Sequence, residues 1–342
     1  MKDARILAWV LADPSRAAQL RPHQWTAMLT IAQAERLLGT LAHRLAGLKV
    51  PEAAARVLDR AQRSAETDRR QALWEAEMAR RALAALGLPV LLLKGTAFLA
   101  AGMDAGAGRL VGDLDILVPR DRMEAAEAAL LSAGWEWVKA DAYDDAYYRN
   151  HMHELPPLIH RARDRMIDVH HTILPLTARA RPDDSALIAD AVDLGNGMKV
   201  LCPEDMVIHA VLHLLADGNL AGGLRNLWDI DRMLREFAET EGFWDRLLAR
   251  SRHHKVTRYV SRALRLSHHI FETPVDRYLA WQGRRGDLFY AGRLLARNGW
   301  GQETATLLRL AFYVRSHWIR MPPLMLARHL FTKWRKGHQP IR

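Results

Sequence analysis

The chain has 342 residues, of which 49% are hydrophobic, so it is long and apolar enough to bury a large core, which excludes a disordered protein. Its single cysteine, Cys202, excludes an internal disulfide bond. The 49 Lys and Arg residues exceed the 39 Asp and Glu residues, and the net charge of +10 favours an anionic partner without naming it.

Membrane insertion is also excluded by the sequence pattern. No stretch reaches the roughly 18 consecutive uncharged apolar residues that a membrane-spanning helix needs. The N-terminal segment MKDARILAWVLADPSRAAQLRP has too short and too interrupted an apolar run for a signal peptide. We therefore expect a cytoplasmic protein without a transmembrane segment.

Residues 1–87 are expected to form an N-terminal helical region. The segments LRPHQWTAMLTIAQAERLLGTLAHRLAGL and PEAAARVLDRAQRSAETDRRQALWEAEMARRALAALG are rich in Ala, Leu, Arg and Glu, with the periodicity of amphipathic helices. Pro51 suits the start of the second long helix. Gly87, followed by Pro89, suits its end.

Residues 88–200 mix short apolar runs with helical segments, which predicts a core region of both helices and strands. In chain order we expect a strand in PVLLLKG, a short helix in TAFLAAGM, a strand in RLVGDLDILV and a helix that Gly134 ends. The segments HELPPLIH and RMIDVHHTIL then suit two strands joined by the turn RARD. The segment AVDLGNGMKVLCP suits a hairpin that turns at residues 195–197.

Residues 201–342 are again helical in pattern and end in a basic tail. From Gly301 to Arg342 eight basic residues face one acidic residue, Glu303, for a net charge of +7. This tail suits a membrane surface, a nucleic acid, or packing on the helical region with a solvated basic face. The expected fold class is α+β, with a small mixed-sheet core between N-terminal and C-terminal helical regions.

Two aspartates, Asp113 and Asp115, interrupt the apolar segment RLVGDLDILV. Because successive side chains of a strand point to opposite faces, the two carboxylates share one face and Leu114 and Ile116 share the other. The apolar face can pack on helices. The two neighbouring carboxylates repel one another, so this pair needs a cation.

The aspartate pair suits Mg²⁺, which binds few protein carboxylates and keeps water and substrate phosphates as its other ligands. A third carboxylate on an adjacent strand would let two ions about 4 Å apart clamp a phosphoryl transfer. Asp168 in MIDVHHTIL is that candidate, because it alternates with apolar residues on a strand of matching character. We expect Asp113, Asp115 and Asp168 to be both metal ligands and catalytic residues.

The triplet Lys94, Gly95 and Thr96 follows the first expected strand and opens a helix. Free backbone N–H groups at such a start favour phosphate, Gly95 allows close backbone approach, and Thr96 adds a hydroxyl donor. Lys94 and Arg109 are candidates to neutralise a phosphate oxygen. The alternatives are a solvent-facing Lys94 and a structural ion pair between Arg109 and Asp104.

The order strand, KGT, helix, RLVGDLDILV, helix and a later strand with IDVHH resembles the nucleotidyltransferase superfamily of DNA polymerase β-like folds. It is most similar to the uncharacterised nucleotidyltransferase family of bacterial proteins, and CPEDMVIHAVLHLL and LWDIDRML extend the similarity. The resemblance implies a triphosphate turn at Gly95 and Thr96. It also implies two Mg²⁺ ions, with Mn²⁺ as a substitute, at Asp113, Asp115 and Asp168.

Two features depart from the superfamily pattern. The turn is Gly-Thr instead of Gly-Ser or Gly-Gly, and the 18 positions from Gly95 to Asp113 exceed the usual spacing. The sequence therefore supports the metal site more strongly than the phosphate turn.

For the other polar residues, structural roles are favoured over catalytic ones. Asp229 and Asp231 are expected on a helix, where they diverge by about 200°, so they cannot share an ion and are expected to be a solvated or capping pair. His209 and His213 have a zinc-compatible spacing but no evident third ligand, which favours packing. Cys202 is expected to be a structural thiol.

His170 and His171 directly follow the strand of Asp168. One of them must share the core face with Val169. For the other, a hydrogen-bonding role is favoured over metal binding.

These patterns predict a Mg²⁺-dependent nucleotidyltransferase that moves a nucleoside monophosphate from an NTP to a hydroxyl acceptor and releases pyrophosphate. The acceptor is open between a tRNA or other RNA end, a protein and a small molecule, and the net charge slightly favours a nucleic acid. The alternative is a non-catalytic basic protein that binds RNA or a membrane surface on a degenerate nucleotidyltransferase scaffold. Salt-dependent binding that survives loss of Asp113 and Asp115 would mark that alternative.

Overall fold

A seven-stranded mixed sheet forms the centre of the chain. The computed structural model describes residues 3–139, 142–280 and 286–320. The strand order is β3-β4-β5-β2-β1-β7-β6, with β2 parallel to β5 and β1 parallel to β7, whereas the other neighbours are antiparallel. This sheet, with helices on both sides of it in the sequence, confirms the expected α+β class. The strands are β1 (Val90–Leu92), β2 (Leu114–Leu117), β3 (Trp135–Trp137), β4 (Leu158–His160), β5 (Met166–His170), β6 (Val192–Asp193) and β7 (Met198–Val200).

Most of the expected strands are present. The strands β4 and β5 flank the RARD turn, and β6 and β7 form the expected hairpin. Three details differ. The strand β2 begins at Leu114, so Asp113 lies just before it, and β4 covers only the last three residues of HELPPLIH. The strand β3 was not expected, since three residues are too few to show a periodicity. Gly134 ends the preceding helix as predicted, with a φ of +103°.

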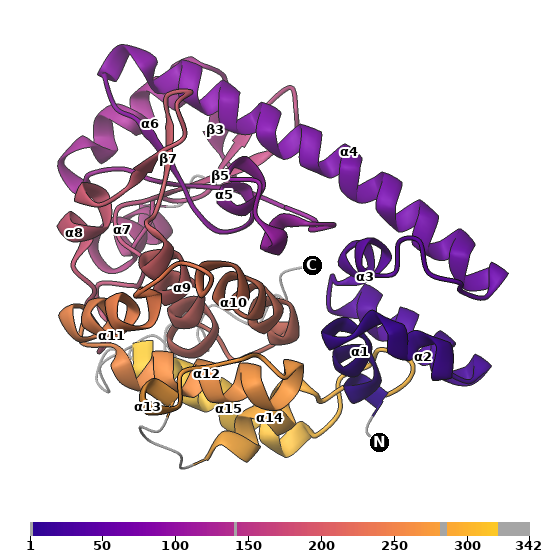
Figure 1. Cartoon of the computed structure of the whole chain (residues 1–342). Helices are drawn as coiled ribbons and strands as arrows, with labels where there is room; N and C mark the ends of the chain where they lie inside the picture. Colours follow the sequence, from indigo (N-terminus) through magenta and orange to yellow (C-terminus); the bar gives the residue numbers. More distant parts are fainter. Residues whose placement is uncertain (1–2, 140–141, 281–285, 321–342) are drawn as a thin grey trace.

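Helices α4, α5 and α6 pack on strands of the sheet, and α4 also packs on α5 and α6. The long helix α4 contacts α5, α6, β1 and β2, and Figure 1 shows it running across the top of the molecule. Pro51 stands at its N-cap, and Gly87, with a left-handed φ of +63°, ends the turn that follows it, as predicted. These helices are α4 (Glu52–Leu83), α5 (Lys94–Ala100), α6 (Met123–Ser132), α7 (Ala142–His151) and α8 (Asp184–Ala189).

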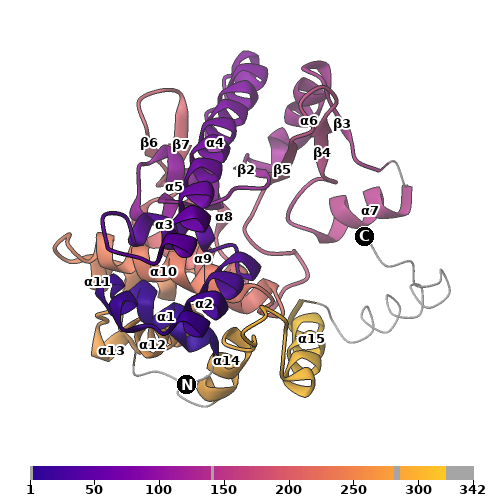
Figure 2. The ribbon, with the colours of Figure 1, turned by 90° about the vertical axis from the view of Figure 1, so that its right-hand side faces the viewer.

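The N-terminal and C-terminal helices meet in space. Helix α1 packs on both α2 and α12, and Figure 2 shows α1 beside α12 although about 245 residues separate them in the sequence. An ion pair between Arg16 and Glu272, at 2.9 Å, joins the same two regions. The helices are α1 (Asp3–Ala12), α2 (Pro22–Ala34), α3 (Leu38–Arg44), α9 (Pro203–Leu212), α10 (Gly223–Phe237), α11 (Phe243–His253), α12 (Thr257–Phe271), α13 (Arg277–Ala280), α14 (Asp287–Leu294) and α15 (Thr306–Arg320).

Five short helical segments complete the helices of the described residues. The first four are 3₁₀ helices and the last is a π turn that continues α9. They are η1 (Pro14–Gln19), η2 (Ala84–Leu86), η3 (Asp104–Gly106), η4 (Arg120–Arg122) and η5 (His213–Asp217).

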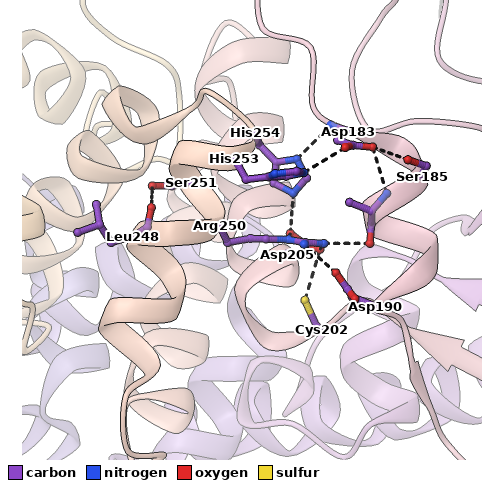
Figure 3. A network of polar contacts seen from close by, with 11 residues as sticks. Asp183, Ser185, Asp190, Cys202, Asp205, Leu248, Arg250, Ser251, His253 and His254 are labelled. Atoms are coloured by element: carbon purple, nitrogen blue, oxygen red, sulfur yellow. Dashed lines mark hydrogen bonds and ion pairs between the residues drawn. The ribbon is translucent and has the colours of Figure 1, made fainter.

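A buried carboxylate, Asp205, connects the central region to the helices that follow it (Figure 3). Arg250 donates to both of its oxygens, at 2.8 and 2.5 Å, and the Cys202 thiol lies 3.3 Å away. His254 accepts the backbone N–H of Asp183 at Nδ1, so its Nε2 carries the proton and donates to Asp205 at 3.0 Å. Burial and the neighbouring Asp205 charge raise the pKa of Cys202 to about 12, which supports its expected structural role.

The structure bears on the prediction that the chain has no transmembrane segment. In the portion that the structure describes, none of the helices combines the length and apolar character needed to cross a bilayer. The expectations for the basic tail concern mainly residues 321–342, which lie outside the described residues.

Candidate active site

Three carboxylates gather where β2 and β5 lie side by side. Asp115 and Asp168 are direct partners in the parallel register of these strands, and Asp113 precedes β2 by one residue. One oxygen from each of the three lies within 4.8 Å of the others. The expected convergence is therefore present, although Asp113 reaches the group from a bend and not from within the strand.

The three carboxylates differ in their exposure. Asp115 is only 3% exposed, Asp168 is half-buried and Asp113 is exposed. Parallel pairing forces Asp115 and Asp168 onto one face, and β2 is buried along its whole length. The group thus extends from the core of the sheet to its surface, where Asp113 is accessible to solvent.

Lys94 and His170 hold the buried member of the group. Lys94 Nζ lies 2.5 Å from Asp115 Oδ1, and His170 Nε2 lies 2.9 Å from the same oxygen. Burial alone would raise the pKa of Asp115, but the Lys94 charge and the His170 hydrogen bond outweigh it and hold that pKa below its ordinary value. Lys94 does not simply face solvent, which was one alternative for it.

The electrostatics of Asp168 are the reverse of those of Asp115. Burial, followed by the charges of Asp115 and Asp113, raises the pKa of Asp168 to about 7. Three carboxylates this close repel one another, so the ionised set gains from a cation placed among them. Oxygen donors with this charge suit Mg²⁺ or Mn²⁺, and the three side chains therefore fit the metal that the sequence pattern predicts.

The KGT triplet opens α5 directly beside this group. Lys94 has a left-handed φ of +50°, and Thr96 is 1% exposed with a hydroxyl that forms no hydrogen bond to the described residues. Other atoms do lie close to Gly95, as expected, but they belong to the side chains of Arg109 and Val111. A Cβ at this position would lie 2.5 Å from Arg109 Nε and 2.9 Å from Val111 Cγ2.

Arg109 forms an ion pair with Asp229, which was expected to be part of a solvated or capping pair. Its guanidinium pairs with Asp229 and not with Asp104, which corrects the structural alternative. Asp229 also binds Arg225, whose guanidinium donates to the carbonyl of Ala105 at 3.1 Å. This arrangement fastens α10 to the loop before β2.

The expectation of a solvated or capping pair in α10 was wrong. Asp229 is 3% exposed and Asp231 is fully buried. Asp231 binds Arg232 and Arg235, whereas Asp229 binds arginines on the other side of the helix. The two carboxylates diverge as expected from the helical period, but each is neutralised inside the protein.

A cavity borders Lys94 on the side of α9 and α10. Its polar lining includes Lys94, Arg109, His209, His213 and Asn226. His209 is 6% exposed. Burial and the neighbouring Lys94 charge lower the pKa of His209 well below its ordinary value, so this histidine is a neutral imidazole on the cavity wall.

Two residues beside His170 were not identified as candidate site residues from the sequence. His153 and Glu154 follow α7 and lie against His170. Both expected roles of the histidine pair are present, since His170 bonds Asp115 and His171 is buried at 5% exposure. The signal for Glu154 was weak, because one charged residue before LPPL in an irregular segment has no periodicity to mark it.

Comparison with known proteins decides the family. The model of an uncharacterised nucleotidyltransferase family matches residues 21–272, which run from α2 to the end of α12. The chain belongs to this family. It is therefore a nucleotidyltransferase, an enzyme that transfers phosphorus-containing groups, and the expected resemblance to this family is confirmed. No curated protein and no solved structure matches the chain.

The extent of the match bears on the site. It includes the three aspartates and the KGT triplet, and it also includes α9 and α10, which line the cavity beside Lys94. The helical extension that the segments CPEDMVIHAVLHLL and LWDIDRML suggested is thus part of the family pattern.

Proposed function

We propose that the chain is a Mg²⁺-dependent nucleotidyltransferase of DNA polymerase β-like fold, which moves a nucleoside monophosphate from an NTP to a hydroxyl acceptor and releases pyrophosphate. The observation that carries this proposal is the convergence, within 4.8 Å, of Asp115 and Asp168 on the neighbouring strands β2 and β5 with Asp113 in the bend before β2. An all-oxygen, highly charged group of this kind suits two divalent ions that also bind phosphates.

Asp113, Asp115 and Asp168 would hold two Mg²⁺ ions, with Mn²⁺ as a substitute. When bound, the ions supply charge neutralisation for the triphosphate and lower the pKa of the acceptor hydroxyl. Lys94 and His170 orient Asp115 through its Oδ1. The exposed Asp113 stands on the side from which substrate enters.

The nucleotide is proposed to lie between this group and the start of α5. Lys94 supplies positive charge beside Asp115, and the amide of Gly95 and the hydroxyl of Thr96 are proposed phosphate donors. The unbonded Thr96 hydroxyl supports this role. Arg109 lines the adjoining cavity while it is paired with Asp229, so we assign it a role in shaping the nucleotide site.

The acceptor follows less directly from the site. The net charge of +10 favours a nucleic acid over a protein or a small molecule, because phosphates gain from basic surface. The competing proposal, a non-catalytic RNA- or membrane-binding protein, predicts binding that is insensitive to the aspartates.

The test is transfer from each of four α-³²P-labelled NTPs, with Mg²⁺ or Mn²⁺, into a cell extract that is then separated into RNA, protein and small-molecule fractions. Asp113→Asn is the informative variant, because Asp113 is exposed and its loss leaves the core intact. Asp121→Asn, an exposed aspartate six positions after Asp115, is the matched control.

We expect label in one fraction with the wild type and the control, and a loss of at least about 100-fold with Asp113→Asn. Equal labelling by Asp113→Asn would contradict the assigned site. No labelling by any form, together with salt-dependent RNA binding by all of them, would favour the non-catalytic alternative.

A further inference from the structure

A second group of side chains that could hold a metal ion includes His170, whose Nε2 contacts Asp115. It consists of His153 and Glu154, in the segment that follows α7, and His170, at the end of β5. The backbone brings them together, because Glu154 forms an antiparallel bridge with His170 and the N–H of His171 donates to the carbonyl of His153 at 2.9 Å. The position of the group is thus set by main-chain pairing.

Two distances within this group are close to those in the coordination shell of a small ion. Glu154 Oε2 lies 3.4 Å from His170 Nδ1 and 3.6 Å from His153 Nε2. Ligands placed tetrahedrally at the bond lengths of Zn²⁺ to nitrogen and oxygen are about 3.3–3.5 Å apart. One carboxylate oxygen therefore stands at nearly the right separation from both imidazole nitrogens.

The state of His170 supports a cation at this point. Its Nε2 faces the Asp115 carboxylate at 2.9 Å, and a carboxylate only accepts, so Nε2 carries a proton. The other nitrogen, Nδ1, is buried, makes no hydrogen bond to any described residue, and faces Glu154. A metal-binding histidine commonly donates its second nitrogen to a carboxylate in this way, which directs its lone pair to the ion.

We propose that His153, Glu154 and His170 bind a single transition-metal ion of the Zn²⁺ class, at a site separate from the three aspartates. Two imidazole nitrogens and one carboxylate oxygen suit Zn²⁺ or Co²⁺ and not Mg²⁺, which prefers oxygen ligands. The Glu154 side chain is 18% exposed, so water can complete the shell from that side.

The ion would connect the two sites through His170. It holds Nδ1, so Nε2 keeps its proton and its hydrogen bond to Asp115. It also ties the segment after α7 to β5. This role is structural and orienting, and it does not require that nucleotide transfer occurs.

The experiment uses the full chain after removal of metals with EDTA, titrated with Co²⁺ as the probe and followed by visible absorption. A four-coordinate site with nitrogen ligands absorbs strongly, whereas a six-coordinate oxygen site such as the aspartates absorbs weakly. We expect one strongly absorbing Co²⁺ per chain, displaced by excess Zn²⁺ and retained by Asp113→Asn.

His153→Ala and Glu154→Gln should each weaken Co²⁺ binding at least about 10-fold or abolish the band. His151→Ala, a histidine two positions away and outside the group, is the matched control and should bind as the wild type does. Glu154→Gln keeps the size of a partly exposed side chain, so it tests the site even if His153→Ala misfolds.

Two results would overturn the proposal. One is a folded wild type, judged by circular dichroism, that gives no strong band. The other is a band that Asp113→Asn removes while Glu154→Gln keeps it, because the probe would then occupy the aspartates.

Discussion

Replacing Asp229 by Asn should destabilise the protein more than any surface change, because two buried guanidinium groups depend on its charge. The Asp229 side chain is 4% exposed, and those of its partners Arg225 and Arg109 are 7% and 14% exposed. Burial lowers the pKa of Arg225 to about 10 even with Asp229 beside it. The variant keeps the shape of the residue and removes only the charge.

The expected loss is about 3–5 kcal/mol in the free energy of unfolding, the usual result when one partner of a buried ion pair is removed. Urea unfolding followed by circular dichroism at neutral pH measures it, with Asp121→Asn as a surface control expected within about 0.5 kcal/mol of the wild type. Adding Arg225→Met to Asp229→Asn removes one of the two unpaired cations and should recover part of the loss.

A loss below about 1 kcal/mol for Asp229→Asn would refute this reasoning. It would mean that α10 is held to the loop before β2 by apolar packing alone. The same outcome would leave Arg109 free to turn toward a bound nucleotide, which the assigned ion pair prevents.

Three further outcomes are expected. Burial would raise the folded-state pKa of Asp205, but the hydrogen bonds of Figure 3 outweigh it and lower that pKa. Asp205 therefore stabilises the fold at pH values above the ordinary aspartate pKa. Its contribution is lost as the pH falls through the folded value, so the stability gap between wild type and Asp205→Asn should shrink from neutral pH to about pH 3 in urea unfolding. Gly95→Ala would press on Arg109 and should cost about 1–3 kcal/mol in the same assay. Lys94→Met leaves the buried Asp115 without its cation. It should lower the melting temperature of the metal-free protein by more than it does in excess Mg²⁺, and an equal drop in both would show that no ion reaches Asp115.

The sequence predicts those parts of the structure that a local pattern determines, such as the alternation of side chains along a strand. The alternation around DLD and IDV placed Asp115 and Asp168 on matching strands, and the structure pairs them residue for residue. Gly134 and the Gly-Asn-Gly turn likewise mark element ends through backbone conformation, which is a local property.

The rest depends on partners that are distant in the sequence. Arg109 meets Asp229, 120 positions away, and no local pattern distinguishes this pairing from a nearby one with Asp104. The charges of α10 suggested a solvated face, yet three arginines of the same helix, together with the distant Arg109, neutralise them inside the protein. Glu154 joins His170 by a single bridge, too short a contact to leave a periodic signal.

The contact between α1 and α12 has a consequence for synthesis on the ribosome. About 245 residues separate the end of α1 from the start of α12, and at roughly 5–20 residues per second their translation takes on the order of 10–50 s. During that time the apolar residues of α1, among them Ile6, Leu7 and Leu11, lack the helix that later covers part of them. The nascent chain therefore offers a binding site for holding chaperones until the second half of the protein has emerged.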